Sequence, residues 1–367
     1  MSTWSDMLPG DPLPWLLASD EPAARWIALT QLLDRPAVDA EVAEAHAAVL
    51  ADAGTVDLLG RVRSWATEIP LSGHDKVDFA PNLLTLLADM GVTAADEPRI
   101  AEVLEGMLAH QREDGAFTAL GRWRTLEKPV WGALPCDAFA IAEVLARAGY
   151  ADNPRAVRGF EFIAGALADT AQGRAWLCVP DPAIPFRGPG RKGDVCPQVT
   201  LEALRAFSYL PPERRPAEVV AAGRVSLAVW HDRGESKPYM FGHGRGFKRT
   251  KWPATWYSAY EVVDTIGRYP ELWGGAGADP ADRRTLAEIA ACAIAYNFDE
   301  RGRLVPRSCF KGFEHHSFGQ KKLPSAFATA RTVVALKRIE ALASEIAMVD
   351  VLALGSSKGG KGTALAP

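Results

Sequence analysis

The sequence predicts an all-α protein in which about five to six helical hairpins, each with an inner and an outer helix, close into an α/α toroid. Apolar residues recur at the i, i+3, i+4, i+7 spacing of an amphipathic helix along most of the 367 residues. The sequence contains no sustained alternation of β-branched and polar residues, which would indicate strands. Five segments also share one plan, a proline-containing lead-in followed by a helix of small and apolar residues. A plan repeated at this length indicates stacked structural units.

The five apolar helices are expected to form the inside of the ring. Proline is favoured in the first turn of a helix, so each lead-in proline marks a predicted helix start. These prolines lie 54 to 71 residues apart, which fits one helical hairpin and a long loop per unit. The predicted inner helices and their prolines are 78–92 (Pro81), 133–150 (Pro135), 194–210 (Pro197), 251–269 (Pro253) and 322–339 (Pro324).

More polar amphipathic helices alternate with these and are expected outside, at 98–111, 153–170, 216–231 and 281–298. Two further helices, over 20–36 and 37–54, are expected to cap or begin the ring. The predicted division is therefore N-terminal helices at 1–59, the toroid at 60–345 and a flexible tail at 346–367. The end of the tail resembles a phosphate loop only superficially, because Gly362 stands where Ser or Thr is required.

Composition excludes several classes of protein. Hydrophobic residues make up 48% and charged residues 23%, as in ordinary globular domains. A net charge of -4 provides no general attraction to nucleic acid. Five scattered cysteines without a CxxC spacing predict reduced thiols. We expect no secretory leader and no transmembrane segment, hence a cytoplasmic protein; the oligomeric state is left open.

A local basic site is predicted in the loops before the last two inner helices. Because the rest of the chain is acidic, this clustering indicates a site for phosphate, diphosphate or carboxylate. A solvated basic surface is the alternative. The residues are Arg245, Lys248, Arg249 and Lys251 in the first loop, and Arg307, Lys311, His315, His316, Lys321 and Lys322 in the second.

Aromatic and acidic residues complete the candidate pocket. Trp252, Trp256 and Tyr257 suit the wall of a pocket for an apolar substrate, although such residues more often belong to a core. Asp137, at the start of the second predicted inner helix, is a candidate general acid if burial raises its pKa, or else a helix cap. His74, His110 and His231 are assigned no role.

One motif resembles a known superfamily. Gln111-x-x-x-Gly115-x-Phe117, after a predicted helix, is similar to the QW repeat of terpenoid cyclases and protein prenyltransferases, in which such turns fasten an α/α toroid. Residues 242–257 and 318–339 also resemble bacterial prenyltransferase-like or squalene-cyclase-like proteins. The resemblance covers about residues 60–340. It implies an enzyme that cyclises or transfers a small amphipathic, isoprenoid-like substrate with an anionic head, bound in the central cavity.

The same resemblance bears on the catalytic groups. Asp194-x-Cys196 is similar to the pair that, with a later histidine, holds zinc in protein prenyltransferases. The next predicted inner helix contains no histidine, so no cofactor is expected and zinc is kept as an alternative. The chain also lacks the DxDD and DDxxD motifs, which leaves Asp137, Asp194 and Cys196 as the catalytic candidates. Two other functions stay open: a non-catalytic toroid that binds a lipid, peptide or partner protein, and a glycan-processing α/α barrel with two facing carboxylates.

Overall fold

A computed structural model describes residues 3–354, apart from 72, 75, 124, 125, 180, 185–192, 237, 239, 240 and 276. Sixteen α-helices and three small two-stranded sheets occupy this described part of the chain. The predicted all-α class is therefore confirmed. The end of the predicted tail, residues 355–367, lies outside the described residues.

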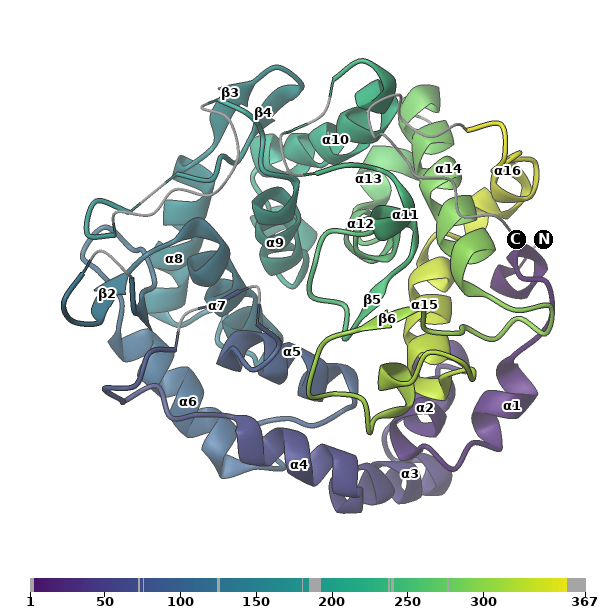
Figure 1. Cartoon of the computed structure of the whole chain (residues 1–367), viewed down its shortest axis with the longest axis horizontal. Coiled ribbons are helices and arrows are strands. Elements are labelled where there is room, and N and C mark those ends of the chain that lie inside the picture. The colour runs from purple at the N-terminus through teal and green to yellow at the C-terminus, as the bar shows by residue number, and fades with distance from the viewer. Residues whose placement is uncertain are drawn as a thin grey trace.

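The helices are arranged around a common centre (Figure 1). Five of them surround that centre: α5 (Ala80–Asp89), α7 (Pro135–Arg147), α9 (Pro197–Ser208), α12 (Ala259–Ile266) and α15 (Ala326–Arg338). Each packs against the next in this series. Arg331 of α15 forms an ion pair with Asp89 of α5 at 3.0 Å, which connects the last of these helices to the first.

A second set of helices lies toward the periphery in Figure 1. It comprises α2 (Pro22–Ile27), α3 (Ala40–Ala51), α4 (Ala53–Arg61), α6 (Pro98–Ala109), α8 (Pro154–Gly165), α10 (Ala217–His231) and α14 (Pro280–Asn297). Helix α10 packs on α9, α14 on α12 and α2 on α15, so the N-terminal helices cover the last central helix. The short helices are α1 (Leu13–Leu17), α11 (Arg245–Lys248), α13 (Pro270–Trp273) and α16 (Ala343–Ala347).

The strands are short connections between helices. β1 (Ala119–Gly121) pairs antiparallel with β2 (Val130–Gly132), and β3 (Ala168–Thr170) with β4 (Gly173–Ala175). β5 (Lys251–Trp252) pairs in parallel with β6 (Ser308–Cys309), with Lys251 opposite Ser308. This last pair brings the two basic loops side by side.

Three of the five predicted helix starts are confirmed. Pro81, Pro135 and Pro197 stand in the first turns of α5, α7 and α9. The prediction is wrong for Pro253, because pairing of β5 with β6 keeps the preceding residues extended. Helix α12 begins only after Ser258, whose hydroxyl accepts a hydrogen bond from the Glu261 N–H.

The fifth start differs by two residues. Pro324 precedes the helix, and Ser325 caps α15 by accepting a hydrogen bond from the Ala328 N–H. Serine provides the side-chain acceptor that the first turn of a helix needs, which proline cannot supply. None of the described helices combines the length and the apolar character needed to cross a bilayer.

The QW-like turn fastens two peripheral helices. The Gln111 side chain donates to the Gly115 carbonyl at 2.8 Å and to the Arg155 carbonyl of α8 at 2.7 Å. Phe117 is 1% exposed and lies against Gly159 of α8, where an added Cβ would come within 2.4 Å of the ring. The turn thus ties the end of α6 to α8.

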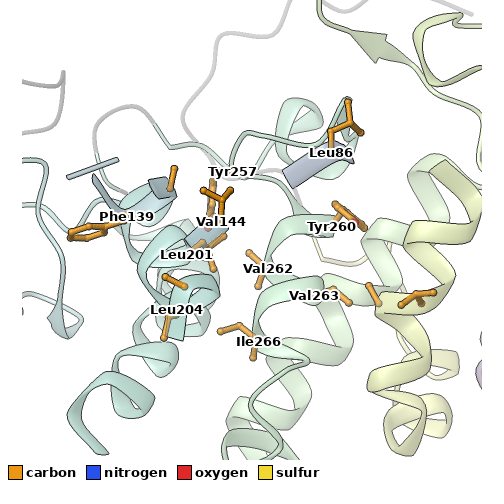
Figure 2. Close-up of a cluster of buried hydrophobic side chains, with 14 of the residues drawn as sticks. Leu86, Phe139, Val144, Leu201, Leu204, Tyr257, Tyr260, Val262, Val263 and Ile266 are labelled. Atoms are coloured by element: carbon orange, nitrogen blue, oxygen red, sulfur yellow. The ribbon is translucent and has the colours of Figure 1, made fainter. Parts of the chain in front are cut away.

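Apolar side chains from neighbouring central helices pack against one another in the core. Figure 2 shows this cluster, with Leu201 and Leu204 from α9 near Val262 and Ile266 from α12. All four residues are less than 2% exposed. Burial of apolar surface of this kind is the main source of stability.

Charged side chains lie between the central helices. Arg147 lies 2.6 Å from Asp89, and Arg205 is bonded to Glu143 and Glu261. The space left between them is a cavity of about 30 Å³, also lined by Trp252 at the end of β5 and by Pro253 to Thr255 in the loop that follows. A cavity of this volume holds one or two water molecules. It is far too small for an isoprenoid chain.

Candidate functional site

Three side chains that commonly bind metal ions meet at the N-terminus of α7. The Nδ1 atom of His74 lies 2.9 Å from the Cys136 sulfur and 3.5 Å from the Asp137 Oδ1. All three potential ligand atoms lie within 4.8 Å of one another. We call this group the His74 centre.

The local sequence explains how the centre is held. Pro135 starts α7, so Cys136 and Asp137 fall in its first turn, where they are only 4% and 2% exposed. Asp137 Oδ1 accepts a hydrogen bond from the His74 N–H at 3.2 Å, and the Asn82 amide of α5 donates to the His74 carbonyl at 3.0 Å. Two central helices therefore fix the loop that carries the histidine.

An aromatic residue from the loop before α12 covers the imidazole. The rings of Trp256 and His74 are stacked, with centroids 6.0 Å apart and planes 21° apart. Of the three predicted aromatic wall residues, Trp256 is the one whose ring contacts the centre. Trp252 packs in the core against Tyr260 and Phe327.

Tyr257 belongs to a separate buried aromatic group. Its hydroxyl is hydrogen-bonded to His243 Nε2 at 2.9 Å, and its ring lies near those of Phe241 and Phe247. The structure therefore gives Tyr257 a core position. This is the alternative that the sequence left open for the aromatic residues.

More thiols surround the centre. Cys196 caps α9, and its N–H donates to the Trp176 carbonyl at 2.9 Å, while Leu177 pairs with Val195. This pairing closes the loop between β4 and α9 and places Cys178 near Cys196. Both cysteines interact electrostatically with Cys136. Asp194 is half-buried and is not among the three grouped ligand residues.

The electrostatics of the centre favour a thiol when no metal is bound. Burial, together with the nearby acidic groups Asp137 and Glu202, raises the pKa of Cys136 well above its usual range. A protonated thiol is a poor nucleophile. The group is thus better suited to binding a cation, which would convert the thiol to a thiolate.

Glu202 of α9 lies beside the centre and is incompletely bonded. It is 3% exposed; Oε1 accepts a hydrogen bond from the Gln198 amide at 2.8 Å, while Oε2 is buried without a partner among the described residues. Burial raises the pKa of Glu202 to about 7, although His74 nearby lowers it. Gln198 is fixed in turn, because its Oε1 accepts from the Tyr257 N–H at 2.6 Å.

This shifted pKa predicts a pH dependence of stability. The carboxyl has a pKa near 4.5 when unfolded and about 7 when folded. Between these values the folded chain holds one more proton, so raising the pH lowers the free energy of unfolding by about 3 kcal/mol in total. Glutamine resembles the protonated acid, so Glu202→Gln is expected to reduce this loss.

The measurement is urea unfolding at pH 5 and pH 7.5 in the presence of a chelator. Glu300→Gln, an exposed site, is the matched control and should behave as the wild type. An equal change in the free energy of unfolding for Glu202→Gln and wild type would contradict the assignment.

A second group with metal-binding side chains lies at the surface. Potential ligand atoms of Asp57, His315 and His316 also fall within 4.8 Å of one another. However, the Arg61 guanidinium already contacts the Asp57 carboxylate, with Nε and Oδ2 2.8 Å apart. A cation would have to compete with this arginine, so the His74 centre is the stronger candidate.

The predicted basic residues do not all lie together at one site. Lys251 is exposed and its ammonium lies 3.8 Å from the centre of the Phe310 ring. Lys321 and Lys322 are exposed, while His316 is stacked on Phe318. None of these side chains is among the three grouped ligand residues of the His74 centre. Arg245 and Lys248 belong to a separate cluster, described below.

For the glycan-processing alternative, the carboxylates that the sequence offers are Asp78, Asp137 and Asp194, each at the start of a predicted inner helix. Asp78 is exposed, and its Oδ1 lies 3.6 Å from Arg61. Asp137 is buried and bonded to His74. These two carboxylates therefore do not form the matched pair that such a reaction needs.

Two residues of the candidate site, His74 and Glu202, were not singled out from the sequence. Asp137 and Cys196 do lie in this region, but His74, which was assigned no role, supplies the imidazole. Glu202 is a buried acid on a helix with an apolar face. An acidic residue within such a helix is the sequence feature that could have identified it. No family model matches this sequence, and no curated protein is significantly similar to it.

Proposed function

We propose that this protein is a zinc-dependent enzyme with an α/α toroid fold, in which His74, Cys136 and Asp137 hold the metal. The observation that carries the proposal is the set of three potential ligand atoms within 4.8 Å of one another, two of them on buried side chains, beside an unpartnered Glu202 oxygen. Sulfur, nitrogen and carboxylate oxygen are the ligands that zinc prefers. Three protein ligands leave one position open, as in catalytic zinc sites.

The donor set fits zinc on several grounds. The carboxyl groups of Asp137 and Glu202 beside Cys136 create a negative environment that a divalent cation would neutralise. When bound, zinc would act as a Lewis acid and lower the pKa of a nucleophile at its open position. The same three side chains would satisfy a tetrahedral ion without rearrangement of a helix, because Cys136 and Asp137 already share the first turn of α7.

Glu202 is the proton acceptor in this proposal. Its pKa near 7 is well matched to accepting and returning a proton at neutral pH. Gln198 holds the Oε1 atom, so Oε2 is the oxygen that takes the proton. Trp256 shields the imidazole of His74 from water on one face.

This arrangement favours group transfer or hydrolysis over proton-driven cyclisation. Asp137, the acid expected for cyclisation, accepts a hydrogen bond from the His74 backbone and contacts its ring. It is therefore a ligand rather than a free acid in this proposal. The small volume of the cavity between the central helices further favours a small substrate that meets the centre at the mouth of the ring, beside Trp256, and not an isoprenoid chain within the ring.

The test uses zinc-loaded protein and a panel of activated esters, thioesters, phosphate esters and allylic diphosphates with a thiol acceptor. We expect turnover that requires zinc. Glu202→Gln should bind one zinc as the wild type does but turn over at least about a hundredfold more slowly, the usual effect of losing a general base. Glu300→Gln, an exposed acid, is the control for a change of charge alone.

Three results would overturn the proposal. Turnover without zinc would remove the metal from the reaction. Equal turnover in Glu202→Gln would exclude Glu202 as the base. Zinc binding without turnover of any substrate class would favour the alternative in which the toroid is a binding scaffold and the metal supports its structure.

A further inference from the structure

Four positive side chains gather where β5 pairs with β6. Arg245 and Lys248 lie on α11, Arg249 follows this helix, and Arg307 precedes β6. Burial and the positive charges of Arg245 and Arg307 lower the pKa of Arg249. The guanidinium groups of Arg245 and Arg307 therefore each lie close enough to Arg249 to repel it. We call these four residues the Arg249 cluster.

No acidic residue compensates this charge. Within the described part of the chain, none of the four side chains forms an ion pair, in contrast to the arginines between the central helices. Lys248 is only 6% exposed, and its ammonium lies 5.1 Å from the centre of the Tyr296 ring. The Arg249 Nε atom is buried without a hydrogen-bond partner among the described residues. Burying an unpaired charge costs stability, so these groups favour an anion that the described residues do not provide.

The cluster is held by a well-anchored backbone. The side chain of Asn297, on α14, donates to the Lys248 carbonyl at 2.8 Å and accepts from the Thr250 N–H at 3.2 Å. These bonds fix the chain on both sides of Arg249. Gly244 and Gly246 have open space beside them, so the cluster is accessible from this side.

We propose that the Arg249 cluster binds the phosphate or diphosphate group of a small molecule. Guanidinium groups match the geometry of phosphate oxygens and form charge-assisted hydrogen bonds with them. Four cations without an acid suit a ligand with at least two negative charges. The Tyr296 ring borders the cluster beside Lys248.

The charge of the whole chain limits the size of the ligand. Asp and Glu number 45 against 41 Lys and Arg, giving a net charge of -4. A long polyanion such as nucleic acid would be repelled by the surrounding surface, whereas a compact anion meets only the cluster. The inference is independent of the metal centre; if the proposed function holds, the cluster is a candidate site for the anionic head of the substrate.

The experiment measures pyrophosphate binding to the full chain in chelator-containing buffer, by calorimetry and by thermal unfolding. We expect saturable binding that raises Tm. Arg249→Gln should weaken binding at least about tenfold, since it removes a charge-assisted contact. Arg99→Gln, an exposed arginine of α6, is the control and should bind as the wild type does.

Lys248→Met distinguishes a binding role from a structural one. It removes a charge that no described acidic group pairs from a side chain that is 6% exposed, and methionine is only one atom shorter than lysine, so the variant should raise Tm without ligand while abolishing the pyrophosphate-induced rise. A lower Tm without ligand, or an unchanged response to pyrophosphate, would overturn the proposal. Equal responses to pyrophosphate and succinate would also overturn it, because they would show charge attraction without phosphate recognition.

A second experiment distinguishes a soluble phosphate compound from the phosphate headgroup of a lipid. Vesicles of phosphatidylcholine with and without phosphatidic acid are sedimented with the wild type and with Arg249→Gln. Absence of sedimentation, together with pyrophosphate binding, supports a soluble ligand. Cluster-dependent sedimentation on phosphatidic acid without pyrophosphate binding would overturn the small-molecule assignment in favour of a lipid headgroup.

Discussion

Replacing Cys136 by serine is expected to weaken zinc binding by more than about a hundredfold. Losing a group that only orients a metal ligand already weakens binding by up to about a hundredfold, and Cys136 is itself a proposed ligand. The thiolate is the softest ligand of the His74 centre, and a serine hydroxyl stays protonated at neutral pH. The fold should persist, because serine is of similar size and Cys136 contributes one hydrogen bond, to His74. The metal-free variant should lose only about 1 kcal/mol of stability.

A competition titration with a chromophoric chelator measures this effect. Cys309→Ser is the matched control, because Cys309 is a free, half-buried thiol on β6 and is not part of the His74 centre. The control should bind zinc with the affinity of the wild type. Equal affinities for Cys136→Ser and the wild type would show that the metal, if bound, is held elsewhere.

Replacing Asp264 by asparagine is expected to lower the free energy of unfolding by about 3–5 kcal/mol, the usual cost of removing one partner of a buried ion pair. Asp264 Oδ1 lies 2.5 Å from Arg338 and 3.9 Å from Arg331, and its Oδ2 lies 3.4 Å from Arg268. Burial alone would raise the pKa of Asp264, but these arginines hold it well below its usual range. The variant leaves three largely buried cations without this carboxylate.

Urea unfolding at neutral pH measures the loss. Asp152→Asn is the control, because Asp152 forms an exposed pair with Arg214, and exposed pairs contribute less than about 1 kcal/mol. The effect of Asp264→Asn should also shrink in strong acid, since the stability that a carboxyl with a lowered pKa provides is lost as the pH falls through that pKa. A loss of stability no larger than that of Asp152→Asn would show that the ion pairs of Asp264 contribute little to the free energy of unfolding.

The helices could be predicted because their pattern is local. Apolar periodicity and prolines located the segments of α5, α7 and α9 to within a few residues, and Pro324 lies two residues before the start of α15. Pro253 failed as a signal because the conformation around it depends on pairing with β6, which lies more than 50 residues later. Such a contact leaves no local trace in the sequence.

The ion pairs between the central helices were not predicted from the sequence, for a related reason. Glu143, Arg205 and Glu261 are visible as single charges within predicted apolar helices. Their pairing needs the relative rotation of three helices, which periodicity alone does not supply. The expectation of an open cavity for an isoprenoid chain followed from the resemblance and passed over these charges.

The candidate site was predictable in part. Asp137 and Cys196 could be found because they stand at the starts of two central helices, α7 and α9. His74 lies in an irregular loop, and nothing in its neighbours indicates that the loop folds over the start of α7. Its position depends on the Asn82 amide of α5 and on stacking with Trp256, both of them contacts beyond the loop.

The most direct test is the zinc content and zinc coordination of the purified full-length protein, by elemental analysis and X-ray absorption at the zinc edge. The account predicts one zinc per chain with a single sulfur ligand at about 2.3 Å and nitrogen or oxygen ligands at about 2.0–2.2 Å. It also predicts loss of the sulfur signal in Cys136→Ser. Protein that takes up no zinc when supplied with it, or a zinc shell without sulfur, would contradict the central claim.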